Sequence, residues 1–351
     1  MNTGLYGIEN SNRGLDDHWS KNSFSSSFPA SIAAYMLDRG IDAVYMYLDR
    51  NSNGELELKH RSVSVSEAFG CGNLRSKDLW FLFETPYEPY KRYCSDRLDG
   101  IDLVIGTSEK DQLRPLEIKL TAYPDNKTAD LPESQQGAEL VIRSATTEYC
   151  ALGMFDSTRK SREDVRKLFD SSCFKVDDWN SEPQVSEIFP GLYRGFSKFL
   201  ERYFKAQKPI LMQVLWKTEG RSPILAEDAF QVIFWSDFAI SWAMLKKCMS
   251  SRSSMSRPMR ALAKVARTLW ELSKSESINL KRIYREMAYG EQTDKEFSIS
   301  GREWRNRLVK DLDLSRFPLS RDVVREIVFD GYIHRLKPER RLDQTLYFTF
   351  S

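Results

Sequence analysis

The sequence has few of the residues from which disulfide frameworks and zinc sites are built. Its 351 residues include five cysteines, none of them in a CxxC pair, and three histidines far apart in the chain. An odd, dispersed set of cysteines is typical of reduced thiols, which excludes a disulfide scaffold and disfavours a zinc or histidine-rich metal site. We therefore expect a cytoplasmic protein.

Long apolar runs and a secretion signal are also missing from the sequence. No stretch approaches the roughly eighteen apolar residues that a membrane-spanning helix needs. The N-terminal stretch MNTGLYGIENSNRGLDDHWSKN lacks the basic-then-apolar pattern of a signal peptide. We therefore expect no contact with a membrane.

Net charge gives little information about partners, because 52 basic residues nearly balance 50 acidic ones. Local clustering of charge has to decide instead. The length is enough for one large domain or two smaller ones. A stretch rich in serine and arginine, SSRSSMSRP at 250–258, is the candidate boundary. We predict a core over residues 1–250, including an N-terminal arm, and a basic C-terminal region over 251–351.

Turn residues and hydrophobic periodicity predict strands that alternate with helices. A first hairpin has strands at 42–50 and 55–65, and a buried strand is expected at 209–218. Residues 78–84 fit a strand or a helix equally well. Helices are predicted at 29–40, 134–155, 196–207, 228–249 and 258–273, and loops at 1–30, 124–134 and 156–178. Strands interleaved with helices favour an α/β or α+β core.

The stretch DGIDLVIGTSEKDQLRPLEIKL, residues 99–120, places three charged residues in two strands that otherwise look buried. Side chains alternate between the faces of a strand, so Glu117 and Lys119 share one face while Ile118 points into the core. A hairpin turn near residues 106–112 brings Asp102 towards both. The sequence thus predicts a cluster of two carboxylates and one ammonium at the end of a sheet.

Two neighbouring carboxylates repel each other unless a cation joins them. Mg2+ is suited to this position, since it binds one or two carboxylates together with substrate phosphate, and Asp102 and Glu117 are its expected ligands. The ion polarises a phosphoryl oxygen and lowers the pKa of a bound water. Lys119 then positions that water or offsets negative charge in the transition state. The pattern indicates phosphodiester hydrolysis; the other interpretation is a solvated strand face with a cross-strand salt bridge.

At these residues the sequence resembles the PD-(D/E)xK nuclease superfamily. Asp102 matches the first acid of the motif and Glu117-Ile118-Lys119 its second half, although Ile101 stands where the motif has proline. Asp99 is a second candidate for the first acid, but the apolar strand begins directly after Asp102. Longer stretches resemble the HindVP-type type II restriction endonucleases over most of the chain: SEAFGCGNLRSKDLWFLFETPYEPYKRYCSDRLDGIDLVI, LRPLEIKLTAYPD and PILMQVLWKTEG.

This resemblance implies a restriction-endonuclease-like core, with a central mixed β-sheet flanked by helices and an additional helical C-terminal region. It also implies Mg2+-dependent cleavage of double-stranded DNA at a short palindrome of the GRCGYC kind. A palindromic site implies a homodimer. Restriction further implies a cognate DNA methyltransferase as the genetic partner.

Superfamily members often add a carboxylate from a helix that precedes the hairpin. Glu67 is the first candidate for this acid and Glu84 the second, and each also fits a surface glutamate. Gln135 and Gln136 open the helix predicted after the site, where related nucleases sometimes place a polar residue near the substrate. They fit a plain helix N-terminus as well.

A basic stripe on the predicted helix 258–273 is the candidate DNA-binding surface of the C-terminal region. At 3.6 residues per turn its cations lie on one side of the helix, nearly opposite the leucines; these are Arg257, Arg260, Lys264 and Arg267. Such a stripe suits a phosphate backbone. The alternative is an amphipathic helix whose basic face meets water or an acidic partner.

Isolated basic residues give weaker indications. Lys127 and Arg143 are candidate phosphate contacts that the sequence does not distinguish from solvated charges. The stretch SISGREWRNR, at 298–307, surrounds Trp304 with arginines. This stretch either enters a DNA groove or anchors the C-terminal region through the tryptophan.

Two other functions fit the same residues. One is a repair nuclease or Holliday-junction resolvase of the same superfamily, although resolvases are usually much shorter. The other is a DNA-binding protein in which the charge cluster is idle. That protein would not cleave DNA with Mg2+, and its binding would be unaffected by Lys119→Ala.

Overall fold

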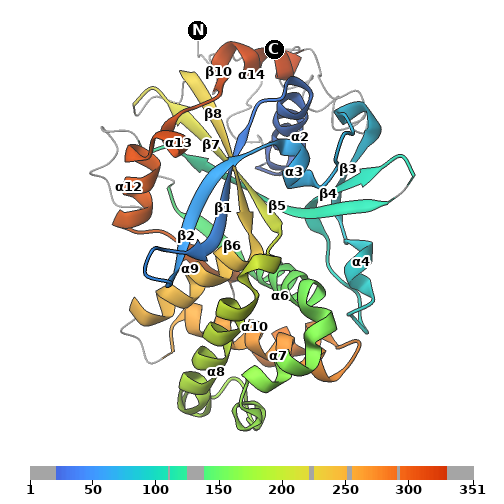
Figure 1. Ribbon diagram of the computed structural model, residues 1–351, viewed down its shortest axis with the longest axis vertical. Helices are drawn as coiled ribbons and strands as arrows, with labels where there is room; N and C mark the ends of the chain where they lie inside the picture. Colours follow the sequence, from blue (N-terminus) through green and yellow to red (C-terminus); the bar gives the residue numbers. More distant parts are fainter. Residues whose placement is uncertain are drawn as a thin grey trace.

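The computed structural model describes residues 21–109, 111–124, 138–220, 225–250, 255–290 and 293–329. Its centre is a mixed eight-stranded sheet of order β2-β1-β8-β7-β5-β4-β3, with β10 also paired to β8 (Figure 1). A small second sheet consists of β6 and β9. The strands are β1 (Ala43–Arg50), β2 (Leu56–Val63), β3 (Leu79–Thr85), β4 (Ile101–Thr107), β5 (Gln112–Ala122), β6 (Leu140–Arg143), β7 (Pro209–Thr218), β8 (Leu225–Ser236), β9 (Lys295–Ile299) and β10 (Leu319–Ser320).

Helices flank the sheet on both sides. They are α2 (Lys21–Arg39), α3 (Val65–Phe69), α4 (Glu88–Lys91), α6 (Ser144–Thr158), α7 (Arg162–Leu168), α8 (Glu182–Tyr203), α9 (Asp237–Ser250), α10 (Arg257–Lys274), α11 (Leu280–Glu286), α12 (Arg302–Lys310), α13 (Leu312–Ser315) and α14 (Arg321–Phe329). Four short 3-10 turns complete the described elements: η1 (Ser76–Asp78), η2 (Arg159–Ser161), η3 (Ser171–Phe174) and η4 (Phe204–Ala206).

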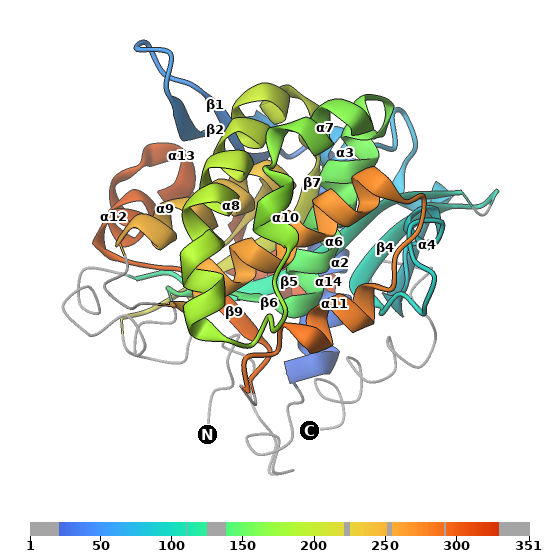
Figure 2. The same cartoon turned by 90° about the horizontal axis from the view of Figure 1, so that it is seen from below.

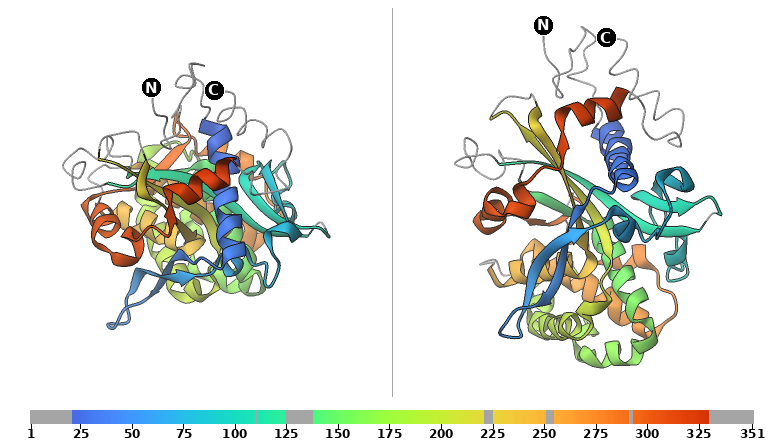
Figure 3. Two further views of the ribbon diagram at one scale, coloured as in Figure 1. Left: turned by 90° about the horizontal axis from the view of Figure 1, so that it is seen from above. Right: turned by 45° about the horizontal axis from the view of Figure 1, so that its top comes forward.

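The sheet divides the buried apolar side chains into two clusters. On one face, Leu211 and Trp235 pack with residues of α6, α8, α9 and α10, and Figure 2 shows α8, α10 and α11 in front of this face. On the other face, Met212 and Phe234 pack with α2, α3 and α14. Figure 3 shows α2 in blue and α14 in red from that side. A central mixed sheet between helices confirms the predicted fold class.

Several predicted strands are confirmed. The hairpin of β1 and β2 pairs antiparallel around the turn at 51–54, and β7 occupies the strand predicted at 209–218. The segment 78–84, left open between strand and helix, is β3, which pairs antiparallel with β4. The strands β4 and β5 form the hairpin predicted around the charged residues.

The segment 228–249 is not the single helix that was predicted, but the strand β8 followed by the helix α9. Because β8 lies between β1 and β7 in the sheet, both of its faces are buried and its apolar residues do not alternate. Such a run has no period that distinguishes it from a buried helix. The change occurs at Ser236, whose hydroxyl accepts a hydrogen bond from the backbone N–H of Ala239 at 2.9 Å and caps α9.

The prediction of one helix over 134–155 is also wrong in its first part. Residues 140–143 form β6, which pairs with the distant strand β9, and the helix α6 begins only at Ser144. Residues 125–137 lie outside the described part of the chain, and so do Lys127, Gln135 and Gln136. Pairing between segments so far apart leaves no local signal in the sequence.

Two helices begin earlier than predicted. Helix α2 begins at Lys21 and contains Pro29. Phe28, directly before this proline, is buried edge-on against Phe230, with ring centroids 5.6 Å apart. Helix α8 begins at Glu182 instead of near residue 196, and α7 lies within the predicted loop 156–178.

The expected boundary near residue 250 does not separate two hydrophobic cores. Helix α10 packs against α6, α7, α8 and α9, and its Leu262 and Leu269 belong to the same buried cluster as Trp235 of the sheet. That residues 251–351 contact DNA stays a prediction. None of the helices in the described ranges has the length and apolar character needed to cross a membrane.

Candidate active site

Strands β4 and β5 carry the three charged residues of the predicted site. The two strands are antiparallel, with Leu103 opposite Leu116. The next residue along each strand, Asp102 on β4 and Glu117 on β5, therefore also lies opposite its counterpart. Leu103 and Leu116 point into the cluster beneath α2, which leaves Asp102 and Glu117 on the opposite face of the sheet. A carboxylate oxygen of Asp102 accepts a hydrogen bond from the backbone N–H of Ile118 at 2.8 Å.

Lys119 lies on the same face as Glu117. Its ammonium nitrogen is 2.5 Å from the Oε1 atom of Glu117. The Glu117 side chain is only 6% exposed and the Lys119 side chain 17% exposed. The structure thus brings together Asp102, Glu117 and Lys119, as the hairpin prediction required. We call these three residues the hairpin cluster.

The hairpin cluster carries more negative than positive charge. The pKa of Asp102 is raised to about 7, first by burial and then by the carboxylate of Glu117, against the lowering effects of the Ile118 N–H and the Lys119 ammonium. A carboxylate that resists ionisation in this way favours a second cation beside it. The available ligands are hard carboxylate oxygens, which is the donor set that Mg2+ binds in proteins.

Glu84 is an additional acid close to the hairpin cluster. It lies between the strand pairs Phe83–Leu103 and Thr85–Ile101, so it stands across from Asp102. Its backbone has a positive φ of 49°, rare for a glutamate. Its carboxylate contributes to the raised pKa of Asp102. This arrangement requires Gly100, because a Cβ atom there would lie 2.7 Å from the carbonyl carbon of Glu84.

The other two candidate acids are held elsewhere by ion pairs. Glu67, in α3, is exposed and accepts hydrogen bonds from Arg61. Asp99 is 56% exposed and lies 2.8 Å from the ammonium of Lys281. Asp99 contributes through its backbone instead, since its carbonyl accepts a hydrogen bond from the Tyr149 hydroxyl at 2.8 Å. The structure therefore favours Glu84, the second candidate in the sequence, over Glu67.

Arg143 lies at the junction of β6 and α6, within electrostatic reach of the hairpin cluster. A hydrogen bond to Asp294 raises the pKa of its guanidinium, burial opposes this, and the charges of Glu117 and Asp102 raise the pKa further. The guanidinium is 2.7 Å from one carboxylate oxygen of Asp294 and is about half exposed. Arg143 is thus a cation near the acidic cluster that remains accessible to a phosphate.

A buried polar network that the sequence analysis did not predict lies beside Lys119 in the sheet. Gln213 of β7 is paired in register with Lys119 and is fully buried. Its amide nitrogen donates to the Thr121 hydroxyl at 3.0 Å, and its amide oxygen accepts from the Trp235 indole at 2.8 Å. These bonds fix β5 against β7 on the face of the site. The only sequence signal is a glutamine inside an otherwise apolar strand.

The basic stripe predicted on α10 is largely buried, which contradicts half of the expected DNA-binding surface. The Lys264 ammonium is 2.6 Å from a carboxylate oxygen of Glu296, and its side chain is 9% exposed. The Arg267 side chain is 8% exposed and pairs with Glu271 at 2.8 Å and with Glu286 at 2.5 Å. Helices pack around most of α10, so these two cations stabilise the fold and are not available to a phosphate backbone.

Arg257 and Arg260, at the start of α10, are half-buried, and Arg260 lies over the ring of Tyr289 at 5.2 Å. Their predicted DNA contacts stay open to test. Trp304 of α12 is buried and packs against the indole of Trp235, with ring centroids 5.0 Å apart. Of the two interpretations of Trp304, the anchor is therefore correct.

Comparison with known proteins identifies the family of this chain. The HindVP restriction endonuclease family matches residues 19–351. The chain is 31% identical over 350 residues to the type II restriction enzyme HgiDI of Herpetosiphon aurantiacus, covering 99% of this chain and 96% of that enzyme. It is 28% identical over 349 residues to the probable type II restriction enzyme HindVP of Haemophilus influenzae, covering 98% and 92%. No solved structure matches the chain. The chain belongs to the HindVP restriction endonuclease family.

Proposed function

We propose that this protein is a type II restriction endonuclease that cleaves both strands of DNA at a short palindrome of the GRCGYC kind, with Mg2+ as its cofactor. Asp102, Glu117 and Lys119 are the proposed catalytic residues. The observation that carries the proposal is their convergence on one face of the β4–β5 hairpin in a family of restriction endonucleases.

Asp102 and Glu117 would hold the Mg2+ ion. Their carboxylates lie opposite each other on adjacent strands. Burial and then the charge of Glu117 raise the pKa of Asp102, and a divalent cation would favour its ionised form. When bound, Mg2+ polarises a phosphoryl oxygen and lowers the pKa of a bound water. The hydrogen bond from the Ile118 N–H fixes the direction of the Asp102 carboxylate.

Lys119 would act on the phosphate that is being cleaved. Its ammonium is held by Glu117 and is partly exposed, so it can donate hydrogen bonds to the phosphoryl oxygens as negative charge develops on them. Arg143 would hold a non-bridging oxygen of the same or the next phosphate, since it is a half-exposed cation near the acidic cluster.

The remaining parts of the proposal follow from the kind of DNA site. A palindrome is read by a two-fold symmetric protein, so we propose a homodimer. A restriction endonuclease also requires a methyltransferase that protects the same site on the host DNA. We propose the cytoplasm as the place where the protein acts.

Incubation of the purified protein with plasmid DNA and Mg2+ tests the proposal. Discrete fragments are expected, and sequencing of their ends identifies the site, the cut position and the overhang. A smear would indicate a nonspecific or repair nuclease. Binding without cleavage, over a range of divalent metals and methylation-free substrates, would indicate a DNA-binding protein with an idle cluster.

A further inference from the structure

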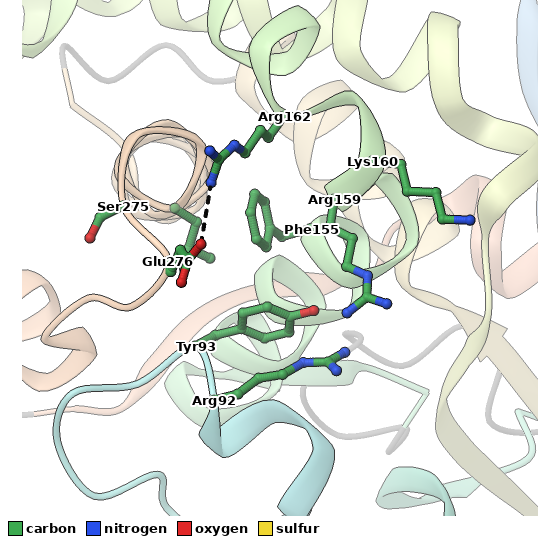
Figure 4. A pocket seen from close by; sticks show the side chains of 9 residues that line it. Arg92, Tyr93, Phe155, Arg159, Lys160, Arg162, Ser275 and Glu276 are labelled. Carbon is green, nitrogen blue, oxygen red and sulfur yellow. Dashed lines mark ion pairs between the residues drawn. The ribbon is translucent and has the colours of Figure 1, made fainter.

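A cavity of about 420 Å3 lies at the C-terminal end of α6. Its walls come from three parts of the chain: the end of α4, the junction of α6 and η2, and the connection from α10 to α11 (Figure 4). Four basic side chains line it, Arg92, Arg159, Lys160 and Arg162, and one acidic one, Glu276. We call this cavity the basic pocket.

The floor of the basic pocket is rigid and aromatic. Tyr93 and Phe155 are buried and pack edge to face, with ring centroids 5.4 Å apart. Arg92 lies over the Tyr93 ring at 4.7 Å and is 2.5 Å from a carboxylate oxygen of Asp156. The guanidinium of Arg92 is therefore held in place before any ligand arrives.

Acidic groups near the basic pocket do not neutralise all of its cations. Asp156 already accepts hydrogen bonds from the Tyr93 hydroxyl at 2.7 Å and from Lys208 at 3.3 Å, besides Arg92. Glu276 is 4.0 Å from Arg162, and its side chain is 93% exposed, so this pair is weak.

Arg159 and Lys160 are the cations with the least compensation. Among the residues that the structure describes, neither has an ion-pair partner. Figure 4 shows the guanidiniums of Arg159 and Arg92 on one side of the Phe155 ring and that of Arg162 on the other, whereas Lys160 points away. Like charges that line one cavity repel, and an anion bound among them would remove that repulsion.

Basic residues at a helix C-terminus also interact favourably with the helix dipole. That effect accounts for Arg159 and Lys160, which directly follow α6. It does not account for Arg92, which comes from the end of α4, more than sixty residues earlier in the sequence. A cavity formed where separate segments bring their guanidiniums together is the arrangement that binds phosphate.

We propose that the basic pocket binds a phosphate group, either of a free nucleotide or of the DNA backbone. Helix α6 has 15 residues, and a rise of 1.5 Å per residue separates its two ends by about 20 Å. B-DNA advances about 3.4 Å per base pair, so for a bond cleaved near the start of α6, a backbone phosphate about six base pairs away would lie at that distance. The DNA backbone as the source of the phosphate rests on the proposed function, whereas a free nucleotide does not.

Titration calorimetry of the full-length protein with inorganic phosphate and with dAMP, at constant ionic strength, tests the first source. Arg159→Ala is the test variant, because Arg159 is exposed and its removal leaves the floor intact. Arg166→Ala is the matched control, since Arg166 is an exposed arginine of the adjacent helix α7 outside the pocket. We expect Arg159→Ala to weaken binding about tenfold, the effect of one charge-assisted hydrogen bond, and Arg166→Ala to leave it unchanged.

Binding of DNA to the same variants tests the second source. Two duplexes are compared, one with flanks of about three base pairs on each side of the cleavage site and one with flanks of about twelve. Only the longer flanks extend about 20 Å beyond the site. If the ligand is backbone phosphate, Arg159→Ala weakens binding of the long duplex alone and lowers the slope of log K against log salt by about one.

The outcomes separate this proposal from the proposed function. Loss of dAMP or phosphate binding in Arg159→Ala supports a nucleotide site even if the wild-type protein cuts no DNA. Loss confined to the long duplex supports a backbone site. Equal behaviour of Arg159→Ala and Arg166→Ala with all four ligands would overturn the proposal.

Discussion

Two clusters in this protein have the same composition and different surroundings. The hairpin cluster contains Asp102, Glu117 and Lys119, whereas the second cluster contains Glu148 of α6, Glu296 of β9 and Lys264 of α10. We call the latter the inner cluster. Each has two carboxyl groups and one ammonium. In the inner cluster Lys264 is 2.6 Å from Glu296, which also accepts a hydrogen bond from the Ser144 hydroxyl at 2.7 Å.

The two clusters differ in the ionisation of their second carboxyl group. Burial, together with the charges of Asp99 and Glu296, raises the pKa of Glu148 to about 8, so at neutral pH this carboxyl is mostly protonated. The inner cluster is thereby neutral without any ligand. Asp102 is less buried than Glu148, and its pKa of about 7 keeps it close to ionisation. The hairpin cluster is thus the one of the two that suits an added cation.

The largest effect is expected from removing members of the hairpin cluster. Asp102→Asn, Glu117→Gln and Lys119→Met should each lower the rate of DNA cleavage at least about a thousandfold, because each removes a proposed metal ligand or the phosphate-facing ammonium. The rate is measured on plasmid under single-turnover conditions. Thermal unfolding should show that each variant is folded, and Asp102→Asn should be at least as stable as wild type, since it relieves repulsion with Glu117.

A variant of this set that cuts at the wild-type rate would exclude that residue from the catalytic site. If a variant loses stability together with cleavage, the hairpin cluster instead stabilises the fold, as the inner cluster does. The comparison between the clusters therefore depends on measuring both quantities for the same proteins.

The inner cluster should respond in the opposite way. Lys264→Met leaves Glu296 buried without its cation, which should lower the free energy of unfolding by about 3–5 kcal/mol. The double variant Lys264→Met/Glu296→Leu should recover most of that loss, because no unpaired charge remains. Denaturant unfolding measures both, and cleavage per folded molecule should stay within about twofold of wild type. A stable Lys264→Met protein that has lost DNA binding would restore Lys264 to the DNA-binding surface.

Glu148 gives a smaller, pH-dependent effect. Its carboxyl titrates at about 8 in the folded protein, against 4.5 for the ordinary group, so the folded state holds a proton that the unfolded chain releases. The stability contributed by this group is complete below pH 4.5 and is lost as the pH rises through 8. Glu148→Gln removes this dependence.

Relative to wild type, Glu148→Gln should gain about 1–3 kcal/mol in free energy of unfolding between pH 5 and pH 8. Denaturant unfolding at these two values measures the gain. Glu163→Gln, which changes an exposed glutamate of α7, is the matched control and should show the same difference from wild type at both values. If Glu148→Gln behaves like the control, Glu148 is ionised in the folded protein and the two clusters do not differ in the way described.

The sequence predicted the hairpin cluster because its geometry is local. Strand alternation fixes Glu117 and Lys119 on one face, and a short turn brings Asp102 to them, so one periodicity and one loop length suffice. The inner cluster was not predictable in this way. Lys264 has helical spacing with other cations, but its partner Glu296 lies on a strand that pairs with β6, a contact that no local pattern encodes.

The same distinction explains the errors in the fold. The hairpins and β7 follow local rules and were predicted correctly. The division of 228–249 into β8 and α9, and of 134–155 into β6 and α6, depends on which distant strands lie beside them. Burial on both faces removes the alternation by which a strand is recognised. The missing information in each case is the identity of a neighbour far away in the chain.

Glu84 and Glu67 provide the smallest and most specific test of the site. The sequence ranked Glu67 first because it lies in a helix before the hairpin, yet that residue pairs with Arg61. Glu84 stands across from Asp102 in a strained backbone conformation, and strain of this kind is retained where the surroundings require it. We expect Glu84→Gln to reduce cleavage about tenfold, or ~1.4 kcal/mol of transition-state stabilisation, and Glu67→Gln to leave it unchanged. The reverse result would show that α3 moves towards the hairpin when DNA binds, since Glu67 could reach Asp102 only if its ion pair with Arg61 opened.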